Sequence, residues 1–169
     1  MLDRPAPSET GLVTIHLRVN GCATSIAAPP FAPLAETLRE RLGLMATKIG
    51  CDAGDCGACT VLLDGEQVCA CLVPSAQAEG SDILTIEGVA HADGTLHPMQ
   101  AAFKENHGLQ CGFCTPGMVM NALEFAKSHP SPSEQEVRES LEGNLCRCTG
   151  YHNIVKSIMA GARAMAASK

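Results

Sequence analysis

The sequence predicts an α+β protein in which a strand-rich domain comes first and a helical domain follows. Three observations support this fold class. Short runs that alternate apolar and polar residues lie between residues 13 and 86, with the turn dipeptides Asn-Gly and Asp-Gly among them. From residue 98 onward, apolar residues recur every three or four positions, as on one face of a helix. The ten cysteines are concentrated in short motifs that both parts contain.

The first two strands are predicted to form a hairpin. Val13–Val19 alternates apolar and polar residues with a period of two, which is typical of a half-buried strand. Asn20-Gly21 follows, a dipeptide that favours a two-residue hairpin turn, so a second strand is expected over Cys22–Ala28. Cys22 belongs to no motif, and we expect it to be a small buried hydrophobe.

A helix and a second hairpin are expected next. Pro33 can open a helix on which leucines recur every four residues, and Gly43 would end it. Asp64-Gly65 then marks another tight turn. The strands expected after the helix are Thr60–Leu63, Glu66–Cys69 and Ile83–Ile86. This order of elements indicates a β-grasp, plant-type ferredoxin-like domain.

The loop between the helix and the second hairpin carries a cysteine motif. Cys51, Cys56 and Cys59 have the C-x4-C-x2-C spacing with which plant-type ferredoxins hold a 2Fe–2S cluster. Glycines between them permit the positive φ angles of a loop that wraps an inorganic core, so that its N–H groups can point at the sulfurs. A fourth thiolate must come from further along the chain, and this reasoning leaves Cys69 and Cys71 both open.

Four short helices are predicted in the C-terminal part, and helices this short imply a compact bundle. Their expected positions are Pro98 to His107, a helix capped by Thr115-Pro116, a helix capped by Ser133 with Glu136 (Ser131 with Glu134 being a competing frame), and Asn153 to Met165. The chain is thus expected to divide into a flexible leader at 1–10, a ferredoxin-like 2Fe–2S domain at 11–90 and a helical 2Fe–2S domain at 91–169.

A second cysteine set lies in the loops between these helices. Cys111 and Cys114 precede the second helix, and Cys146 and Cys148 lie between the third and the fourth. Four thiolates brought together in this way can hold zinc or an iron–sulfur core. The spacing alone does not decide, but the first motif in the same chain favours a second iron–sulfur cluster over zinc.

Composition argues against nucleic-acid-binding, secreted and membrane-spanning proteins. The net charge of −6, made more negative by a thiolate-bound cluster, disfavours a nucleic-acid partner. The N-terminus lacks the basic and apolar regions of a signal peptide, and no apolar run approaches the roughly 18 residues of a membrane span. Thiols persist as metal ligands in a reducing compartment, so a cytoplasmic protein is expected.

Three motifs occur in order along the chain: Lys48–Gly65, Gln110–Met118 and Gly143–Tyr151. In these motifs, and over residues 12–165 as a whole, the sequence resembles the small iron–sulfur subunit of the molybdenum hydroxylases. This is the family of xanthine oxidase, aldehyde oxidoreductase, carbon monoxide dehydrogenase and quinoline oxidoreductase. The resemblance implies a β-grasp domain with one 2Fe–2S cluster and a four-helix domain with another. By family spacing, it also implies that Cys71 rather than Cys69 completes the first site.

The resemblance implies a function in electron transfer. In similar enzymes the substrate is hydroxylated at a molybdenum–pterin centre with oxygen from water, and single electrons pass through the two clusters to FAD. The cluster of the helical domain is implied to lie nearest the molybdenum. Gln110 and Cys148 match positions that hydrogen-bond the pterin, with an amide that only fixes its loop as the alternative for Gln110. No residue of this chain is expected to be catalytic.

The resemblance implies partner subunits as well. Single-chain relatives continue into flavin and molybdenum domains, whereas this chain stops at Lys169. We therefore expect a large molybdenum–pterin subunit, with the pterin in its cytosine dinucleotide form, and a medium FAD subunit, assembled as a dimer of heterotrimers. The chain alone is expected to have no turnover. The substrate of the complex stays open among N-heterocycles, aldehydes, purines, nicotinate and carbon monoxide.

Two other classes of protein are kept as alternatives. A free-standing two-cluster ferredoxin would carry electrons without obligate partners, but the helical domain argues against this class. A zinc-stabilised interaction protein is an alternative for the second cysteine set only. Colour separates the two metals, because iron–sulfur protein is red-brown and zinc protein is colourless.

We predict that the fully reconstituted chain binds about four iron ions and shows two separable EPR signals after reduction, because its two four-cysteine sets lie in differently built loops. Iron and labile-sulfide analysis gives the first quantity, and EPR of the reduced protein gives the second. A fully reconstituted chain that holds only about two iron ions would contradict the second cluster.

Overall fold

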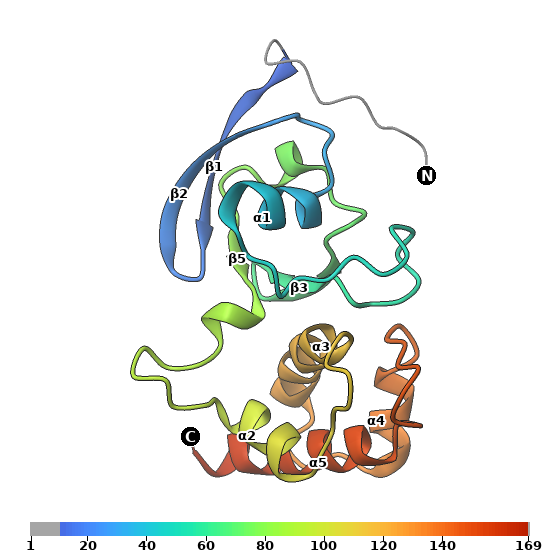
Figure 1. The fold of residues 1–169 in the computed structure, drawn as a ribbon. Coiled ribbons are helices and arrows are strands. Elements are labelled where there is room, and N and C mark those ends of the chain that lie inside the picture. The colour runs from blue at the N-terminus through green and yellow to red at the C-terminus, as the bar shows by residue number, and fades with distance from the viewer. Residues whose placement is uncertain (1–10, 169) are drawn as a thin grey trace.

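The computed structural model describes residues 11–168, so the leader predicted at 1–10 lies outside the described residues. Within this range the chain forms two parts, which Figure 1 shows one above the other. The first is a five-stranded sheet with one α-helix against it, and the second is a group of four α-helices. The predicted α+β fold class is confirmed. None of the described helices is both long and apolar enough to cross a membrane.

The sheet is mixed, and its strands are not arranged in the order of the sequence. The strands are β1 (Val13–Val19), β2 (Cys22–Ala28), β3 (Thr60–Leu63), β4 (Glu66–Cys69) and β5 (Asp82–Leu84). Their order across the sheet is β2-β1-β5-β3-β4. β1 and β5 pair in parallel, and the other neighbouring pairs are antiparallel. The chain therefore returns after the second hairpin and inserts β5 at the centre of the sheet.

Both predicted hairpins are confirmed, and their turns have the geometry that Asn-Gly and Asp-Gly favour. Asn20 and Gly21 have φ angles of 51° and 81°, and Asp64 and Gly65 have φ angles of 51° and 91°. Positive φ at both central residues is characteristic of a type I′ turn, whose twist matches that of the flanking strands. The turn residues therefore set the register of both strand pairs.

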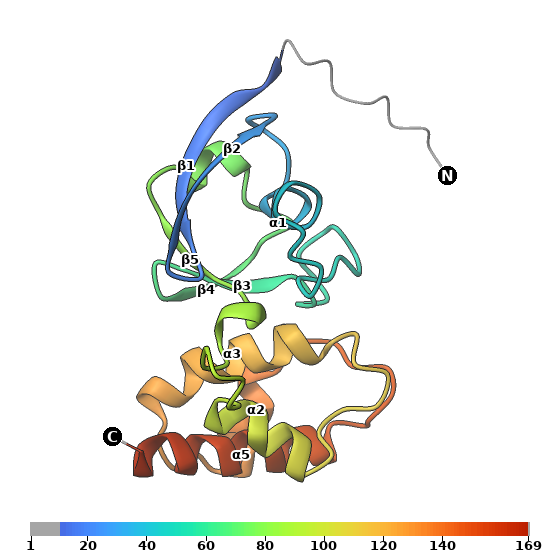
Figure 2. The ribbon, with the colours of Figure 1, turned by 60° about the vertical axis from the view of Figure 1, so that its left-hand side comes forward.

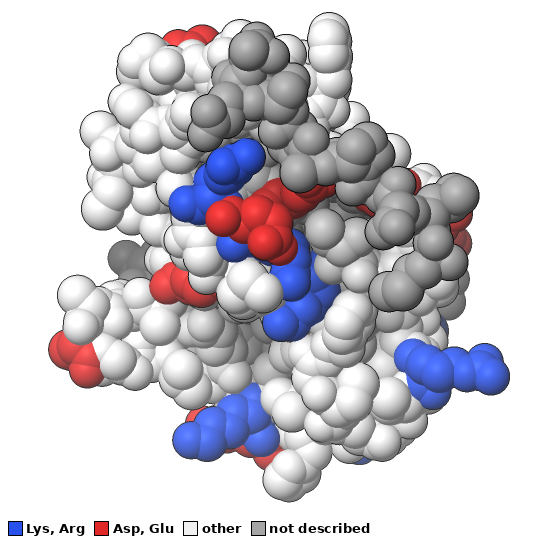
Figure 3. Space-filling view, turned by 45° about the horizontal axis from the view of Figure 1, so that its top comes forward, with Lys and Arg blue, Asp and Glu red and all other residues white. Residues whose placement is uncertain are grey.

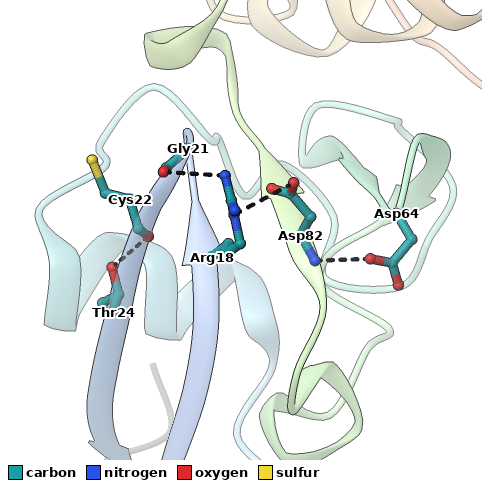
Figure 4. Close-up of polar contacts among 6 residues, drawn as sticks. All are labelled: Arg18, Gly21, Cys22, Thr24, Asp64 and Asp82. Carbon is teal, nitrogen blue, oxygen red and sulfur yellow. Dashed lines mark hydrogen bonds and ion pairs between the residues drawn. The ribbon is translucent and has the colours of Figure 1, made fainter.

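β5 is tied to the elements on both sides of it, as Figure 4 shows. The main-chain N–H of Asp64 donates to the Asp82 carbonyl oxygen at 2.8 Å, and Asp64 Oδ1 accepts the Asp82 N–H at 2.8 Å. On the other side, Nε of Arg18 lies 3.8 Å from an Asp82 carboxylate oxygen. These contacts fix the start of β5 between the two hairpins.

The last strand is shorter than predicted. The sequence indicated a strand over Ile83–Ile86, but β5 ends at Leu84, and a 3₁₀ turn, η3 (Ile86–Gly88), follows. The main-chain N–H of Thr85 donates to Asn20 Oδ1 at 2.9 Å instead of to a strand. Because β1 has already entered its turn at Asn20, the chain leaves the sheet here.

The prediction that Cys22 is buried is wrong, because its side chain is exposed. Cys22 begins β2, an edge strand of the sheet, and lies beside the hairpin turn (Figure 4). The residues that β2 buries, Ile26 and Ala28, lie at its other end. Val19, which pairs with Cys22 across the hairpin, is buried, but β2 has no described strand on its other side, and the thiol at its start stays exposed.

The predicted helix after the first hairpin is confirmed as α1 (Leu34–Leu42), with Pro33 at its N-cap. Leu34 and Leu38 are fully buried in the same apolar cluster as Ile15 of the sheet. Gly43 ends the helix with a φ angle of 70°, and its N–H donates to the Arg39 carbonyl oxygen at 3.1 Å. The left-handed conformation is one that glycine adopts without steric cost.

The helices of the C-terminal part are α2 (Pro98–Glu105), α3 (Thr115–Ser128), α4 (Glu134–Ser140) and α5 (His152–Ala167). The predicted capping box before α4 is confirmed, because Ser133 Oγ accepts the Glu136 N–H at 3.3 Å and Glu136 Oε2 accepts the Ser133 N–H at 2.8 Å. The competing frame of Ser131 with Glu134 is wrong. Thr115, expected as a cap, is instead the first residue of α3.

The N-cap of α2 was not evident from the sequence. His97 Nδ1 accepts the Met99 N–H at 3.2 Å, and the Gln100 side chain accepts the His97 N–H at 3.0 Å. Only an unprotonated ring nitrogen can accept a hydrogen bond. Burial lowers the pKa of His97, and the nearby charge of His91 lowers it further. The folded state therefore favours the neutral imidazole that the cap requires.

α3 joins the two parts of the chain. It packs against β3, and Leu62 of that strand belongs to the same apolar core as Met118 and Leu123 of the helix. Leu84 and Ile86 pack against this core as well. Figure 2 shows α3 as the helix nearest the sheet. The two parts are therefore held together by shared side-chain packing.

Surface charges contribute less to the stability of the fold than this apolar packing does. On the face shown in Figure 3, acidic and basic groups lie next to each other, and most of the other described surface is uncharged. Arg138 and Glu134 form an exposed ion pair of 2.7 Å, and His16 Nδ1 lies 3.1 Å from a Glu79 carboxylate oxygen at the surface. Solvent screens exposed contacts of this kind, so they contribute little to stability. The apolar cores, which enclose α1 and α3, hold the fold.

We predict that His97 makes stability depend on pH. A histidine whose pKa is lowered by folding binds its proton more readily in the unfolded chain, so its contribution is complete above about pH 6.5 and declines below that value. His97→Asn keeps a capping side chain that does not titrate, whereas His97→Ala should lose about 0.5–2 kcal/mol at neutral pH. Unfolding midpoints between about pH 8 and pH 5 measure both effects. An unchanged pH dependence in His97→Asn would contradict this role.

Candidate iron–sulfur centres

The first cysteine set begins in the loop that leads from α1 into β3. The loop turns tightly at Gly54 and Gly57, which have φ angles of 81° and 66°. The turns bring main-chain N–H groups to the sulfur of Cys51, which accepts hydrogen bonds from Ala53 and Cys56 at 3.4 Å each. The positive φ angles predicted for the glycines of this loop are therefore present at Gly54 and Gly57.

The cysteines of this set differ in burial. Cys51 is exposed, whereas Cys59 and Cys71 are buried. The N–H groups of Ala53 and Cys56 lower the pKa of Cys51 to about 7. Burial, and then the hydrogen bond with Cys59, raises the pKa of Cys71 to about 11. A cysteine must lose its thiol proton to bind a metal. The exposed Cys51 loses this proton more readily than the buried Cys71.

Cys69 and Cys71 both lie close to the set, so proximity does not choose between them. Cys69 pairs with Thr60 across the β3–β4 hairpin, and its sulfur lies 3.6 Å from the Gly54 carbonyl oxygen. Cys59 has side-chain hydrogen bonds with both Cys69 and Cys71. The choice of Cys71 as the fourth ligand therefore stays a prediction.

The second cysteine set is brought together by two loops from distant parts of the sequence. One loop precedes α3 and the other connects α4 to α5, and Figure 2 shows them side by side. The sulfurs of Cys111 and Cys148 lie 3.5 Å apart, although 37 positions separate them in the sequence. Cys114 and Cys146 share a side-chain hydrogen bond. All four cysteines that the sequence analysis grouped are thus neighbours.

Tyr151 closes the second of these loops around Cys146. Its hydroxyl accepts the Cys146 N–H at 2.9 Å and donates to the Asn144 carbonyl oxygen at 3.2 Å. Thr149 Oγ1 accepts the Tyr151 N–H at 3.1 Å and lies 3.1 Å from the Cys146 sulfur. Tyr151 has a φ angle of 67°, which is uncommon for a bulky residue. The polar groups of the loop hold it in this conformation.

The second set also has a buried and an exposed side. Burial, followed by the hydrogen bond with Cys146, raises the pKa of Cys114 to about 12. Cys111 is exposed, and the main-chain N–H of Phe113 lowers the pKa of its thiol. Cys148 is exposed as well. One side of the set therefore faces the helical core while the other faces solvent.

Each set supplies the four thiols that a 2Fe–2S cluster requires. Within residues 11–168, no three Cys, His, Asp or Glu side chains converge as closely as they would around a single metal ion. A 2Fe–2S cluster spreads its ligands more widely, because each of its two irons takes only two of the four thiolates. The cysteines and the hydrogen bonds to their sulfurs suit this larger, anionic group.

Gln110 and Cys148, which the resemblance associates with the pterin, lie on the exposed side of the second set. The Gln110 side chain is exposed, and it forms no hydrogen bond to another residue in the described part of the chain. The alternative of an amide that fixes its loop gains no support from this geometry. Large exposed apolar side chains lie beside the cysteines of both sets, namely Ile49, Leu72, Phe113 and Leu145.

Two buried asparagines at the junction of the cysteine loops were missed in the sequence. Asn144 Nδ2 donates to the Gly57 carbonyl oxygen at 3.2 Å, and Asn121 Nδ2 donates to Asn144 Oδ1 at 2.6 Å. Asn144 lies within one of the three motifs, two residues before Cys146. Its partner Gly57 is 87 positions away, and no local pattern indicates a contact over that distance.

The sequence matches two protein families. Residues 17–85 match the 2Fe-2S iron-sulfur cluster binding domain, and residues 85–159 match the 2Fe-2S binding domain. The chain is 47% identical to the nicotine 6-hydroxylase small subunit of Paenarthrobacter nicotinovorans, over 90% of this chain and 92% of that subunit. It is 46% identical to the xanthine dehydrogenase iron-sulfur-binding subunit of Escherichia coli O157:H7, over 90% of this chain and 94% of that subunit.

A solved structure shares the fold. The crystal structure of quinoline 2-oxidoreductase from Pseudomonas putida 86 contains a chain that superposes with a TM-score of 0.89 at 45% sequence identity. The match covers 94% of this chain and 97% of that one. The resemblance drawn from the three motifs is thereby confirmed. The chain belongs to the family of the small iron–sulfur subunits of molybdenum hydroxylases, and it carries two 2Fe–2S binding domains.

Proposed function

We propose that the chain is the electron-transfer subunit of a molybdenum hydroxylase and relays single electrons from a molybdenum–pterin centre to FAD, both carried by partner subunits. The observation that carries the proposal is the presence of two four-cysteine sets in one rigidly packed chain, each within a matched 2Fe–2S domain. When bound, a 2Fe–2S cluster accepts and releases one electron at a time. The chain itself holds the clusters, insulates their buried sides and contributes no catalytic residue.

The proposed ligands are Cys51, Cys56, Cys59 and Cys71 for the first cluster and Cys111, Cys114, Cys146 and Cys148 for the second. Their grouping in two loop systems supports this assignment. Main-chain N–H groups that reach the Cys51 sulfur would stabilise the added negative charge of a reduced centre. The proposed boundary between the two domains lies near residue 90, between η3 and α2.

Electrons are proposed to enter on the exposed side of the second set. Gln110 and Cys148 both face solvent there, so a pterin carried by a partner subunit can reach them. The Gln110 amide can donate and accept hydrogen bonds with the polar edge of such a ring, while the Cys148 sulfur binds iron. The first cluster would then pass the electrons on to FAD.

Exposed apolar side chains support docking to larger subunits. Ile49, Leu72, Phe113 and Leu145 are between 37% and 60% exposed, and each lies next to or within two positions of a proposed ligand. Apolar groups gathered around a functional site are typical of interaction surfaces. The proposed partners are a large molybdenum–pterin subunit and a medium FAD subunit in a doubled heterotrimer, with the pterin as its cytosine dinucleotide.

The proposed reaction of the complex is hydroxylation of an N-heterocycle, an aldehyde or a similar substrate with oxygen from water, or oxidation of carbon monoxide. The similar subunits are named for nicotine and xanthine, and the similar structure for quinoline, so related small subunits occur with different substrates. The proposed compartment is the cytoplasm, because thiol ligands persist where the redox environment is reducing. All ten cysteines are free of disulfide bonds in the structure, in keeping with that compartment.

We predict that Cys71→Ser removes or alters the first cluster, because a hydroxyl is a poorer iron ligand than a thiolate, whereas Cys69→Ser leaves both clusters in place. Iron content and the EPR spectrum of the reduced protein distinguish the two variants. Cys22→Ser is the matched control, since Cys22 is exposed on the sheet and belongs to neither set. Loss of the first signal in Cys69→Ser, with Cys71→Ser unaffected, would transfer the ligand role to Cys69.

The proposed electron path predicts that Cys148→Ser, in the assembled enzyme, alters the second cluster and slows its reduction by substrate. The first cluster should remain reducible by dithionite, because its ligands lie in other loops. Rapid mixing with substrate followed by freeze-quench EPR measures the reduction of each cluster separately. Normal reduction of the first cluster by substrate while the second is absent would contradict the proposed order.

Gln110→Ala supplies a milder companion to that experiment, with Cys22→Ser again as the control. Gln110→Ala removes the proposed hydrogen bond to the pterin, which is worth about 0.5–1.5 kcal/mol. We expect both clusters to assemble, while association with the molybdenum subunit weakens or the first transfer slows. Unchanged association and an unchanged first transfer would remove Gln110 from the proposed contact.

A further inference from the structure

The loops of the two cysteine sets meet at Gly57, a position that has no room for a side chain of its own. A Cβ atom added at Gly57 would collide with the Gly143 carbonyl oxygen and the Asn144 side chain. A Cβ atom added at Gly117 of α3 would in turn collide with the Gly57 carbonyl oxygen. Main chain therefore lies directly against main chain at this junction. Small shifts of either loop would change the separation of the two sets.

Two neighbouring residues of the second loop hold two neighbouring carbonyl groups of the first. The Leu145 N–H donates to the Cys56 carbonyl oxygen at 2.9 Å, and Asn144 Nδ2 donates to the Gly57 carbonyl oxygen at 3.2 Å. Leu145 directly precedes Cys146. One residue and one hydrogen bond thus lie between a proposed ligand of the second cluster and a proposed ligand of the first.

The Asn144 amide can point only one way. Asn144 is 3% exposed, and its Oδ1 accepts a hydrogen bond from Asn121 Nδ2 at 2.6 Å. Asn121 is also 3% exposed, and its Nδ2 donates to the Ser140 carbonyl oxygen at 2.8 Å. With Oδ1 engaged in this way, Nδ2 of Asn144 is directed at Gly57. Reversing the amide would leave buried donors facing one another, which is costly.

One polar atom of this pair has no hydrogen-bond partner in the described part of the chain. Asn121 Oδ1 is buried and has no hydrogen-bond partner within the described residues. Asn121 and Asn144 line a cavity of about 240 Å³, together with Gly54 and Cys69 of the first cysteine region. The other amide groups of the pair, Asn121 Nδ2 and both Oδ1 and Nδ2 of Asn144, are hydrogen-bonded.

We infer that Asn144, oriented by Asn121, is a positioning residue that fixes the first cluster loop against the second and thereby sets the coupling between the two clusters. The inference rests on the proposed function, because it requires both cysteine sets to hold clusters. Transfer between fixed redox centres slows steeply as their separation grows. An apolar side chain of the same size could fill the site but could not hold the Gly57 carbonyl group in one place.

The experiment uses the reconstituted full-length chain with Asn144→Leu, Asn121→Leu and the double variant. Leucine is close to asparagine in size, so the loss of hydrogen bonds dominates the change. Asn106→Leu is the matched control, because Asn106 donates a single side-chain hydrogen bond to Ala102 at the end of α2. Iron content and the EPR signal of each cluster are measured first. The magnetic dipolar splitting between the two reduced clusters and the rate of transfer between them are measured next.

We expect Asn144→Leu and Asn121→Leu to bind the same amount of iron as the unchanged chain, but to lose the single well-defined dipolar splitting and to transfer electrons more slowly between clusters. The double variant should be no worse than Asn144→Leu, because Asn121 acts through Asn144. Asn106→Leu should keep the splitting and the rate. A purely structural role would lower iron content or thermal stability and leave the splitting of the intact fraction unchanged.

Other results would contradict either the positioning role of Asn144 or the proposed function. An unchanged splitting and rate in both single variants, or the same change in Asn106→Leu, overturns the positioning role alone. If Asn144→Leu fails to bind iron, the positioning role is tested with Asn121→Leu. This variant keeps the Asn144 amide but removes the hydrogen bond that orients it. Failure of the unchanged chain to show two clusters overturns the proposed function, and the positioning role with it.

Discussion

The backbone contact between α3 and the loop of the first cysteine set is the constraint on which the rest of the structure depends. At Gly57 and Gly117 the chain approaches itself so closely that neither position has room for a side chain. The contact is supported from the sheet, where Leu62 enters the apolar core of the helices. Two loops that differ in sequence, length and neighbours are thereby held in one arrangement. A relay needs this kind of rigidity, because its centres must keep a constant separation.

Local turn chemistry explains why so much of the sheet could be predicted. Asn20-Gly21 and Asp64-Gly65 specify their turns without help from distant residues, and the strands beside them follow. The end of β5 could not be predicted in this way, because it depends on where β1 turns and on the side chain of Asn20. The exposure of Cys22 likewise depends on the position of β2 at the edge of the sheet. The residues of one strand do not indicate its place in the sheet.

The same distinction applies to the candidate site. Cysteine spacing within each loop indicated the two sets, because a cluster requires its ligands at short, fixed intervals. Asn121 and Asn144 carried no such signal, since their roles arise only when residues 23 and 87 positions apart meet. His97 is a further example, because histidine is not among the residues usually expected at an N-cap. Polar groups that act between segments become visible only in three dimensions.

The shared core also limits how this protein could be divided or recombined. Leu62, Leu84 and Ile86 precede the helices in sequence but pack into the apolar core that the helices form. A helical fragment cut out near residue 90 would leave these side chains behind and open its own interior to water. Exchange of the helical half between related subunits would meet the same difficulty, unless the matching face of the sheet were exchanged too. The two halves are therefore better regarded as co-adapted than as interchangeable modules.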